Sequence, residues 1–178
     1  MNPIEMLKND HKNVKAMLDE MEKRDADQRK ELLADLERDL EIHTQLEEEI
    51  VYPAFRDAST RVIERRLYFE ATEEHHVVDM VLPELKMVSA DNERFAARVK
   101  VVRELLDHHI EEEENEMLPK MYEMLGEARL QEMGRRMVER RTELEREWAS
   151  TLGKAKHKAK SVAEKFMPAS AKDLRDRR

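Results

Sequence analysis

The sequence predicts an all-α protein, an up-down-up-down antiparallel four-helix bundle with an additional C-terminal helix. Glycine and proline are rare, with 3 and 5 among 178 residues, while charged residues make up 42% of the chain and apolar residues 40%. This composition is typical of long helices. Apolar side chains recur at steps of three and four residues over most of the chain, which is the period of an amphipathic helix. Short polar segments separate four such stripes, and short connections favour antiparallel neighbours.

Each of the four stripes is bounded by a polar or turn-forming segment. Asn2 is a favourable N-cap residue and Pro3 suits a first helical turn, so the first helix is expected to begin at the N-terminus. The later helices are separated by polar residues that interrupt the helical period. The stripes therefore predict helices over about residues 4–21, 33–54, 68–85 and 95–117, with breaks at 23–29, 57–60 and 89–93.

Two prolines and a glycine mark further interruptions. Pro53 and Pro119, near the ends of the second and fourth helices, should kink or stop them because proline has no backbone N–H to donate. Gly126 should break the chain's helical course, and the helical period then resumes from residue 127 to about 150. We expect residues 1–150 to form the bundle with this fifth helix, and residues 151–178 to form a basic, flexible tail.

Charge and composition exclude several classes of protein. The net charge is −8, but residues 151–178 hold nine Lys or Arg and three acids, so the first 150 residues carry −14. An acidic body argues against nucleic-acid binding. No stretch approaches the roughly 20 apolar residues of a membrane span, and the N-terminus does not resemble a secretory signal, so we expect a cytoplasmic protein. Because the chain has no cysteine, any metal must be bound by nitrogen and oxygen.

One histidine interrupts each of the four apolar stripes. In the second and fourth helices a glutamate follows this histidine by four residues and so lies on the same helical face. A buried polar group costs roughly 2–7 kcal/mol unless something compensates it, and a pair of metal ions would remove that cost. Mixed histidine and carboxylate ligation suits iron or manganese better than tetrahedral zinc. The residues concerned are His11, His43, Glu47, His75, His109 and Glu113.

These residues also repeat along the chain. His43, Glu47 and Pro53 are each followed 66 residues later by a residue of the same type, and His11 is followed by His75 after 64. The spacing indicates a duplicated helical hairpin and a pseudo-two-fold site for two metal ions. Each half would supply two imidazoles and one carboxylate, and the two carboxylates are placed to bridge the metals.

Several neighbouring residues allow two interpretations. Asp10 and Glu74, each directly before a core histidine, either orient imidazoles or lie solvated. His76 and His108 are expected at the surface or beside the ligands rather than among them. The acids that flank the two core glutamates are expected mostly on a solvated face, where some attract cations toward the site: Glu48, Glu49, Glu111, Glu112 and Glu114.

Four segments resemble the helical segments of the hemerythrin-like HHE cation-binding family: DH at 10–11, HTQLEEEIVYP at 43–53, EEHHVVDMVL at 73–82 and HIEEEENEMLP at 109–119. The similarity covers about residues 3–140. It implies a hemerythrin-like bundle that holds two non-haem iron ions, which an oxo group can bridge, with the six core residues as ligands. It also implies small oxidants as partners, namely O₂, hydrogen peroxide or nitric oxide, and it does not identify a protein partner.

One position departs from the oxygen-carrying members of that family. They place a further histidine four residues after the third-helix ligand, where this chain has Asp79. Asp79 shares a helical face with His75, so it is either a third carboxylate ligand or a neighbour of the ligands, and reversible O₂ carriage is disfavoured. We expect oxygen, iron or redox sensing, or a role in oxidative stress, with an enzyme that decomposes hydrogen peroxide or nitric oxide as the alternative. A ferritin-like carboxylate enzyme ranks lower, because Glu73–His76 is the only Glu-x-x-His match.

Overall fold

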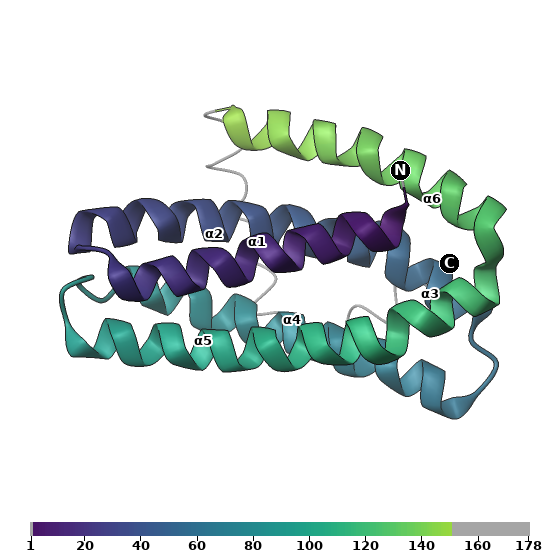
Figure 1. Cartoon of the computed structure of the whole chain (residues 1–178), viewed down its shortest axis with the longest axis horizontal. Helices are drawn as coiled ribbons and strands as arrows, with labels where there is room; N and C mark the ends of the chain where they lie inside the picture. The colour runs from purple at the N-terminus through teal and green to yellow at the C-terminus, as the bar shows by residue number, and fades with distance from the viewer. Residues whose placement is uncertain (1, 151–178) are drawn as a thin grey trace, which may run out of the picture. The chain divides into compact units, whose positions relative to one another are not determined.

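The structure, a computed structural model, describes residues 2–150, and within them every regular element is helical. Figure 1 shows the long helices α1, α2, α4 and α5 side by side, with the short connections from α1 to α2 and from α4 to α5 at the same end. The predicted antiparallel four-helix bundle is confirmed. The predicted tail, residues 151–178, lies outside the described residues. The four bundle helices are α1 (Pro3–Lys23), α2 (Ala26–Leu46), α4 (Val62–Lys86) and α5 (Glu93–Glu112).

The first two helices begin at residues whose side chains cap them. The Asn2 side chain accepts a hydrogen bond from a backbone amide in the first turn of α1, and Pro3 occupies that turn, as predicted. Asp25 caps α2 by accepting from two backbone amides, so α2 begins at Ala26. The predicted break at 23–29 is therefore too long. The polar residues from Ala26 onward belong to the solvent-facing first turn of α2. Such a turn has the same polar composition as a loop, so the sequence pattern did not distinguish the two.

Neither Pro53 nor Pro119 ends its helix. Each is preceded by a five-residue π-helix, whose i→i+5 hydrogen bonds make a wider turn. A proline lacks one donor and its ring crowds the carbonyl of the preceding turn, and a wider turn accommodates both effects. The expected disruption thus takes the form of a π-helix, and the helical course continues. The π-helices are η1 (Glu47–Val51), followed by α3 (Tyr52–Ala58), and η2 (Glu113–Met117), followed by α6 (Leu118–Ala149).

Gly126 interrupts α6, as predicted. Its φ of 72° and ψ of 168° are non-helical, and a positive φ is readily adopted by glycine because it lacks a Cβ. Helical structure resumes after it and reaches Ala149, close to the predicted end of the fifth helix. By its internal contacts the bundle unit extends to Thr142, and a second unit begins at Glu143.

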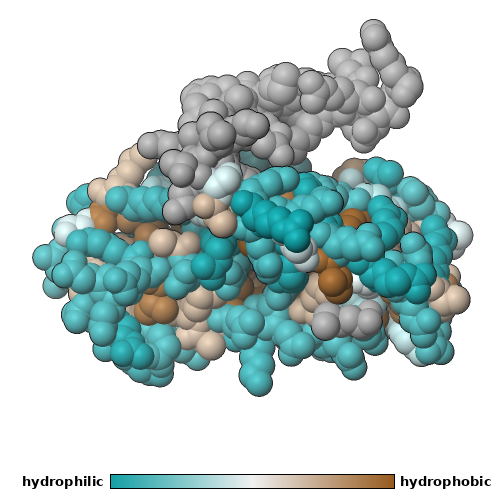
Figure 2. All heavy atoms as spheres, turned by 90° about the horizontal axis from the view of Figure 1, so that it is seen from above, coloured by the Kyte–Doolittle hydropathy of each residue, from teal (hydrophilic) through white to brown (hydrophobic). Residues whose placement is uncertain are grey.

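Apolar side chains fill the bundle on both sides of a polar layer. Toward the α1–α2 and α4–α5 connections, each helix contributes side chains that are at most 1% exposed, among them Leu18, Leu36, Leu85 and Val102. The face seen in Figure 2 is mainly hydrophilic, with smaller hydrophobic areas between the polar side chains. Among residues 2–150, no helix combines the length and the apolar character that a membrane crossing requires. The polar layer consists of His11, His43, Glu47, His75, His109 and Glu113, each at most 6% exposed.

Candidate metal centre

The six core residues singled out in the sequence meet at one level of the bundle. Their side chains form two groups, and within each group the ligand atoms lie within 4.8 Å of one another: His11, His43, Glu47 and Glu113 in the first, and Glu47, His75 and His109 in the second. Glu47 belongs to both groups. Glu113 approaches the second group as well, since its Oε2 lies 3.9 Å from His109 Nε2. The two carboxylates therefore lie between two pairs of imidazoles.

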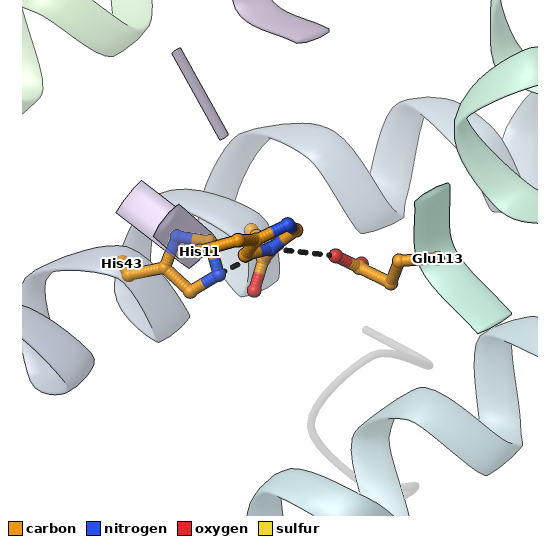
Figure 3. Close-up of side chains that lie close together, drawn as sticks. His11, His43 and Glu113 are labelled. Carbon is orange, nitrogen blue, oxygen red and sulfur yellow. Dashed lines mark ion pairs between the residues drawn. The ribbon is translucent and has the colours of Figure 1, made fainter. Parts of the chain in front are cut away.

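The first pair of imidazoles comes from α1 and α2. His11 Nε2 lies 3.3 Å from Glu113 Oε2, and His43 Nε2 lies 3.2 Å from Glu47 Oε1. The two rings meet edge to face, with centroids 4.8 Å apart. Figure 3 shows His11 and His43 next to each other, with the carboxylate of Glu113 pointing toward His11. Both imidazoles thus direct the same ring nitrogen toward the carboxylates.

The second pair of imidazoles comes from α4 and α5. His75 Nε2 lies 3.2 Å from His109 Nε2 and 3.3 Å from Glu47 Oε2. Two ring nitrogens at this distance share at most one proton. Without that proton, two lone pairs face each other in a buried space, an arrangement that a cation between them would stabilise.

The outer nitrogen of every core imidazole has a carboxylate partner. Because an ionised carboxylate only accepts hydrogen bonds, each Nδ1 carries the hydrogen, and the neutral imidazole then has its lone pair on the inward-facing Nε2. Metal-binding histidines in proteins almost always have this arrangement. The Nδ1 contacts are His11 with Glu114 at 2.9 Å, His43 with Asp10 at 3.3 Å, His75 with Glu48 at 3.3 Å and His109 with Glu74 at 2.9 Å.

Asp10 and Glu74 do contact imidazoles, the first of the two interpretations that the sequence left open. Each contacts the core histidine of a neighbouring helix rather than the histidine that follows it in the chain. Asp10 of α1 contacts His43 of α2, and Glu74 of α4 contacts His109 of α5. Adjacent residues on a helix point about 100° apart, so an acid next to an inward histidine points toward the adjoining helix.

Glu48 and Glu114 are contacts that sequence reasoning missed, because both were expected on a solvated face. Glu114 lies 2.9 Å from His11 Nδ1, and Glu48 lies 3.3 Å from His75 Nδ1. The duplication carried a usable signal. Glu114 follows Glu48 by 66 residues, the same spacing that relates the core histidines and glutamates of α2 and α5.

Several buried polar atoms in the layer have no aligned hydrogen-bond partner among the described residues. Among the residues that the structure describes, His11 Nε2, both Oε atoms of Glu47 and Glu113 Oε2 are buried without an aligned hydrogen-bond partner. A buried group of this kind costs about 1–3 kcal/mol, and more when it is charged. Inward lone pairs from four imidazoles and two carboxylates fit a pair of metal ions, and this nitrogen and oxygen donor set suits iron or manganese.

Without metal, the carboxylates hold protons on the imidazoles. Burial opposes protonation of His43, but Glu47 and Asp10 outweigh it and raise its pKa to about 10. Burial also opposes protonation of His75, but Glu47 and Glu48 raise its pKa to about 9. Burial would raise the pKa of Glu47, but His43 and His75 hold it well below its usual range. The layer is therefore built to hold positive charge between its carboxylates.

Tyr52 is a further residue of the site that sequence reasoning missed. Its hydroxyl donates to Glu113 Oε1 at 2.8 Å and lies 3.2 Å from His75 Nε2. Its ring stacks on the His75 imidazole with centroids 5.4 Å apart. Burial, together with the carboxylates of Glu113 and Glu47, raises the pKa of the Tyr52 hydroxyl well above its usual value, so the hydroxyl keeps its proton.

The π-helix η1 explains how Tyr52 reaches the site. The Tyr52 amide bonds to the Glu47 carbonyl, five residues earlier, so the two residues lie about one turn apart on the same face. In a continuous α-helix their side chains would point in different directions, which is why helical periodicity did not identify Tyr52. The residue 66 positions later is Leu118, so the phenol oxygen makes the two halves of the site unequal.

Three polar residues near the site remain outside the two buried groups. Asp79, the seventh ligand candidate, is exposed on α4 and belongs to neither of the two buried groups. His76 is exposed, and the His108 side chain is 64% exposed, as expected for residues outside the ligand layer. His75, and not His76, faces the other core imidazoles.

Comparisons with known proteins agree with this fold. The family model of the hemerythrin HHE cation binding domain matches residues 2–121. A crystal structure of a hemerythrin HHE cation binding domain-containing protein from Mycobacterium kansasii superposes with a TM-score of 0.71 and 26% identity, covering 81% of this chain and 87% of that one. A DNA nickase from Nostoc sp. is 26% identical over 116 residues, which are 65% of this chain and 32% of the nickase, so the chain spans about a third of that relative's length. The chain belongs to the hemerythrin HHE cation-binding domain family.

Proposed function

We propose that this chain binds two non-haem iron ions and responds through them to O₂, hydrogen peroxide or nitric oxide, in oxygen, iron or redox sensing or in the response to oxidative stress. The observation that carries the proposal is the buried layer of inward imidazole nitrogens and carboxylates, in which His11 Nε2, both Oε atoms of Glu47 and Glu113 Oε2 have no aligned hydrogen-bond partner among the described residues. His11 and His43 would hold one ion and His75 and His109 the other, and Glu47 and Glu113 lie close enough to both pairs to serve either ion.

The chain's own residues would orient and tune the iron ligands. The carboxylates on the Nδ1 atoms fix each ring's orientation and increase the basicity of the inward nitrogen. Tyr52 holds Glu113 through its hydroxyl and so orients one bridging carboxylate. When bound, the iron pair supplies one- and two-electron redox chemistry. Because the six proposed ligands are each at most 6% exposed, a reacting molecule must be small.

An enzyme that decomposes hydrogen peroxide or nitric oxide is the second candidate. The Tyr52 hydroxyl favours it, because an O–H group that keeps its proton beside His75 Nε2 would donate to a molecule bound on that side by turning away from Glu113 Oε1. The same group also fits the sensing role, in which it would stabilise a bound ligand without turnover. Steady-state kinetics distinguish the two roles.

The nickase activity of the Nostoc relative is not carried over to this chain. The match covers 32% of that protein. In addition, the first 150 residues carry a net charge of −14, which disfavours approach to the phosphates of DNA.

Elemental analysis of the purified protein, combined with peroxide and nitric oxide kinetics, tests the proposal. We expect two iron atoms per chain and an absorption spectrum that changes when one equivalent of oxidant is added to the reduced protein. Consumption that stops after stoichiometric oxidation indicates sensing, whereas continued turnover faster than with the same concentration of free iron indicates an enzyme. Protein that takes up less than one iron atom per chain, or whose spectrum is unaffected by all three oxidants, would refute the proposal.

A further inference from the structure

A second group of ligand atoms lies at the surface of the bundle, next to the buried layer. It consists of Glu74 on α4 and of His108 and Glu112 on α5, whose ligand atoms lie within 4.8 Å of one another. His108 Nε2 lies 3.5 Å from Glu74 Oε1 and 3.6 Å from Glu112 Oε1. His108 and Glu112 are four residues apart and therefore share a face of their helix. We call these three residues the outer group.

Glu74 connects the outer group to the buried layer, because one of its carboxylate oxygens faces His108 and the other contacts His109. Its Oε2 accepts a hydrogen bond from His109 Nδ1 at 2.9 Å, and its Oε1 faces His108 Nε2. The Glu74 side chain is 22% exposed, so it is neither buried with the imidazoles nor freely solvated.

The corresponding acid in the first half of the chain has a cationic partner. Asp10 contacts His43 Nδ1 and also accepts a hydrogen bond from the guanidinium of Arg141 on α6. Glu114, which contacts His11, lies 3.7 Å from the ammonium of Lys8. In these two cases a fixed positive charge balances the acid that holds an imidazole.

Around Glu74 the corresponding place is occupied by an imidazole and by a second acid, Glu112. Two carboxylates converging on one imidazole nitrogen concentrate negative charge there, and a cation would balance it. The duplication did not produce this group, since the residues 66 positions before His108 and Glu112 are Ile42 and Leu46, which are apolar and at most 3% exposed.

We propose that Glu74, His108 and Glu112 bind a divalent transition-metal ion at the surface of the bundle. One imidazole and two carboxylates suit Fe²⁺, Mn²⁺ or Zn²⁺. Because the His108 and Glu112 side chains are 64% and 34% exposed, water can complete the coordination. The ion balances the negative charge of Glu74, as the Arg141 guanidinium balances that of Asp10.

The outer ion also influences the buried centre, and this part of the inference rests on the proposed function. An ion on Glu74 Oε1 withdraws electron density from the carboxylate that accepts the His109 Nδ1 hydrogen bond. His109 then becomes a less basic ligand for the inner iron. Binding of the outer ion therefore weakens the ligand field that His109 provides to one of the two inner ions.

Titration of the iron-loaded protein with Mn²⁺, followed by the electron paramagnetic resonance signal of free Mn²⁺, tests the site. Mn²⁺ is the weakest binder in the divalent series and should not displace inner iron. We expect one Mn²⁺ to bind per chain. Glu112→Gln should weaken that binding at least tenfold while leaving the iron content unchanged. The matched control is Glu111→Gln, an exposed neighbour with the same loss of charge that lies outside the outer group.

Two results would overturn the inference. One is wild-type protein that binds no Mn²⁺, which means that protons alone balance the two acids. The other is equal weakening by Glu111→Gln and Glu112→Gln, which means that Mn²⁺ responds only to the general negative charge of α5. The outcome is separable from that of the proposed function. Two iron atoms per chain without an Mn²⁺ site refute only the outer site. An Mn²⁺ site that is lost in Glu112→Gln, in a protein that takes up no iron when iron is offered, refutes only the iron centre.

Discussion

Two pairs of adjacent histidines show how a single step along a helix separates the core from the surface. His75 is 6% exposed and faces Glu47, whereas its neighbour His76 is exposed. His109 is 3% exposed, whereas the His108 side chain is 64% exposed. Each residue turns the side-chain direction by about 100°, so a purely local feature of the sequence decides which imidazole of each pair faces the candidate metal site.

Replacing each member of the first pair tests this distinction. His75→Ala should reduce bound iron by at least half and lower the melting temperature of the iron-loaded protein, because metal binding to the folded state stabilises it. His76→Ala is the matched control and should retain both iron atoms. Iron content by elemental analysis and thermal unfolding followed by circular dichroism measure the two effects. Similar iron contents in the two variants would refute the assignment of His75.

Tyr52→Phe tests the role of the buried hydroxyl. The ring remains to stack on His75, but Glu113 Oε1 loses its donor. We expect the metal-free protein to lose about 1.5–3 kcal/mol of unfolding free energy, the usual contribution of a hydrogen bond to a charged group. Urea denaturation provides the measurement. Tyr122→Phe, at a tyrosine that is 52% exposed, should change stability by less than about 0.5 kcal/mol. A Tyr52→Phe effect as small as that of the control would count against the hydrogen bond.

At the scale of the helices, the sequence predicted those features that follow the 3.6-residue period. It predicted four bundle helices, the interruption at Gly126 and the inward placement of the six core residues. It did not predict η1 and η2, because the spacing of apolar residues was interpreted with the α-helical period and a π-helix has a different period. Tyr52 was missed for this reason, while the Nδ1 partners of the imidazoles depend on contacts between helices that no single-helix pattern contains.

The apolar side chains toward the α1–α2 and α4–α5 connections should stabilise the fold without affecting metal binding at the candidate site. Leu36 is fully buried and lies seven residues before His43, about 10 Å along the helix. Leu36→Ala should therefore cost about 2–5 kcal/mol of unfolding free energy and still leave two iron atoms bound at temperatures where the protein is folded. Leu32→Ala, at a partly buried position of the same helix, should cost less. Loss of iron from folded Leu36→Ala protein would show that the site is not determined locally.

At the scale of the whole molecule, the polar layer should make stability depend on pH in opposite ways with and without metal. In the metal-free protein the pKa of His43 is about 10 and that of His75 about 9, both above the ordinary value of 6.5. The stabilisation from these raised pKa values is fully present below pH 6.5 and is lost as the pH rises through 9 and 10. Iron competes with the same protons, so its stabilisation should be weakest in acid.

Melting temperatures of metal-free and iron-loaded protein between pH 5 and 10 test this expectation. The metal-free protein should become less stable toward pH 10. The difference between the two forms should grow as the pH rises from 5. A metal-free melting temperature that stays constant or increases above pH 6.5 would show that the carboxylates do not raise the pKa values of His43 and His75.

Anomalous diffraction at the iron absorption edge, from crystals of the iron-loaded protein, tests the central proposal most directly. Two anomalous peaks are predicted inside the bundle, one between His11 and His43 and the other between His75 and His109, with Glu47 and Glu113 contacting both. A single peak there, or iron found only at the surface of the bundle, would contradict a two-metal centre in this layer.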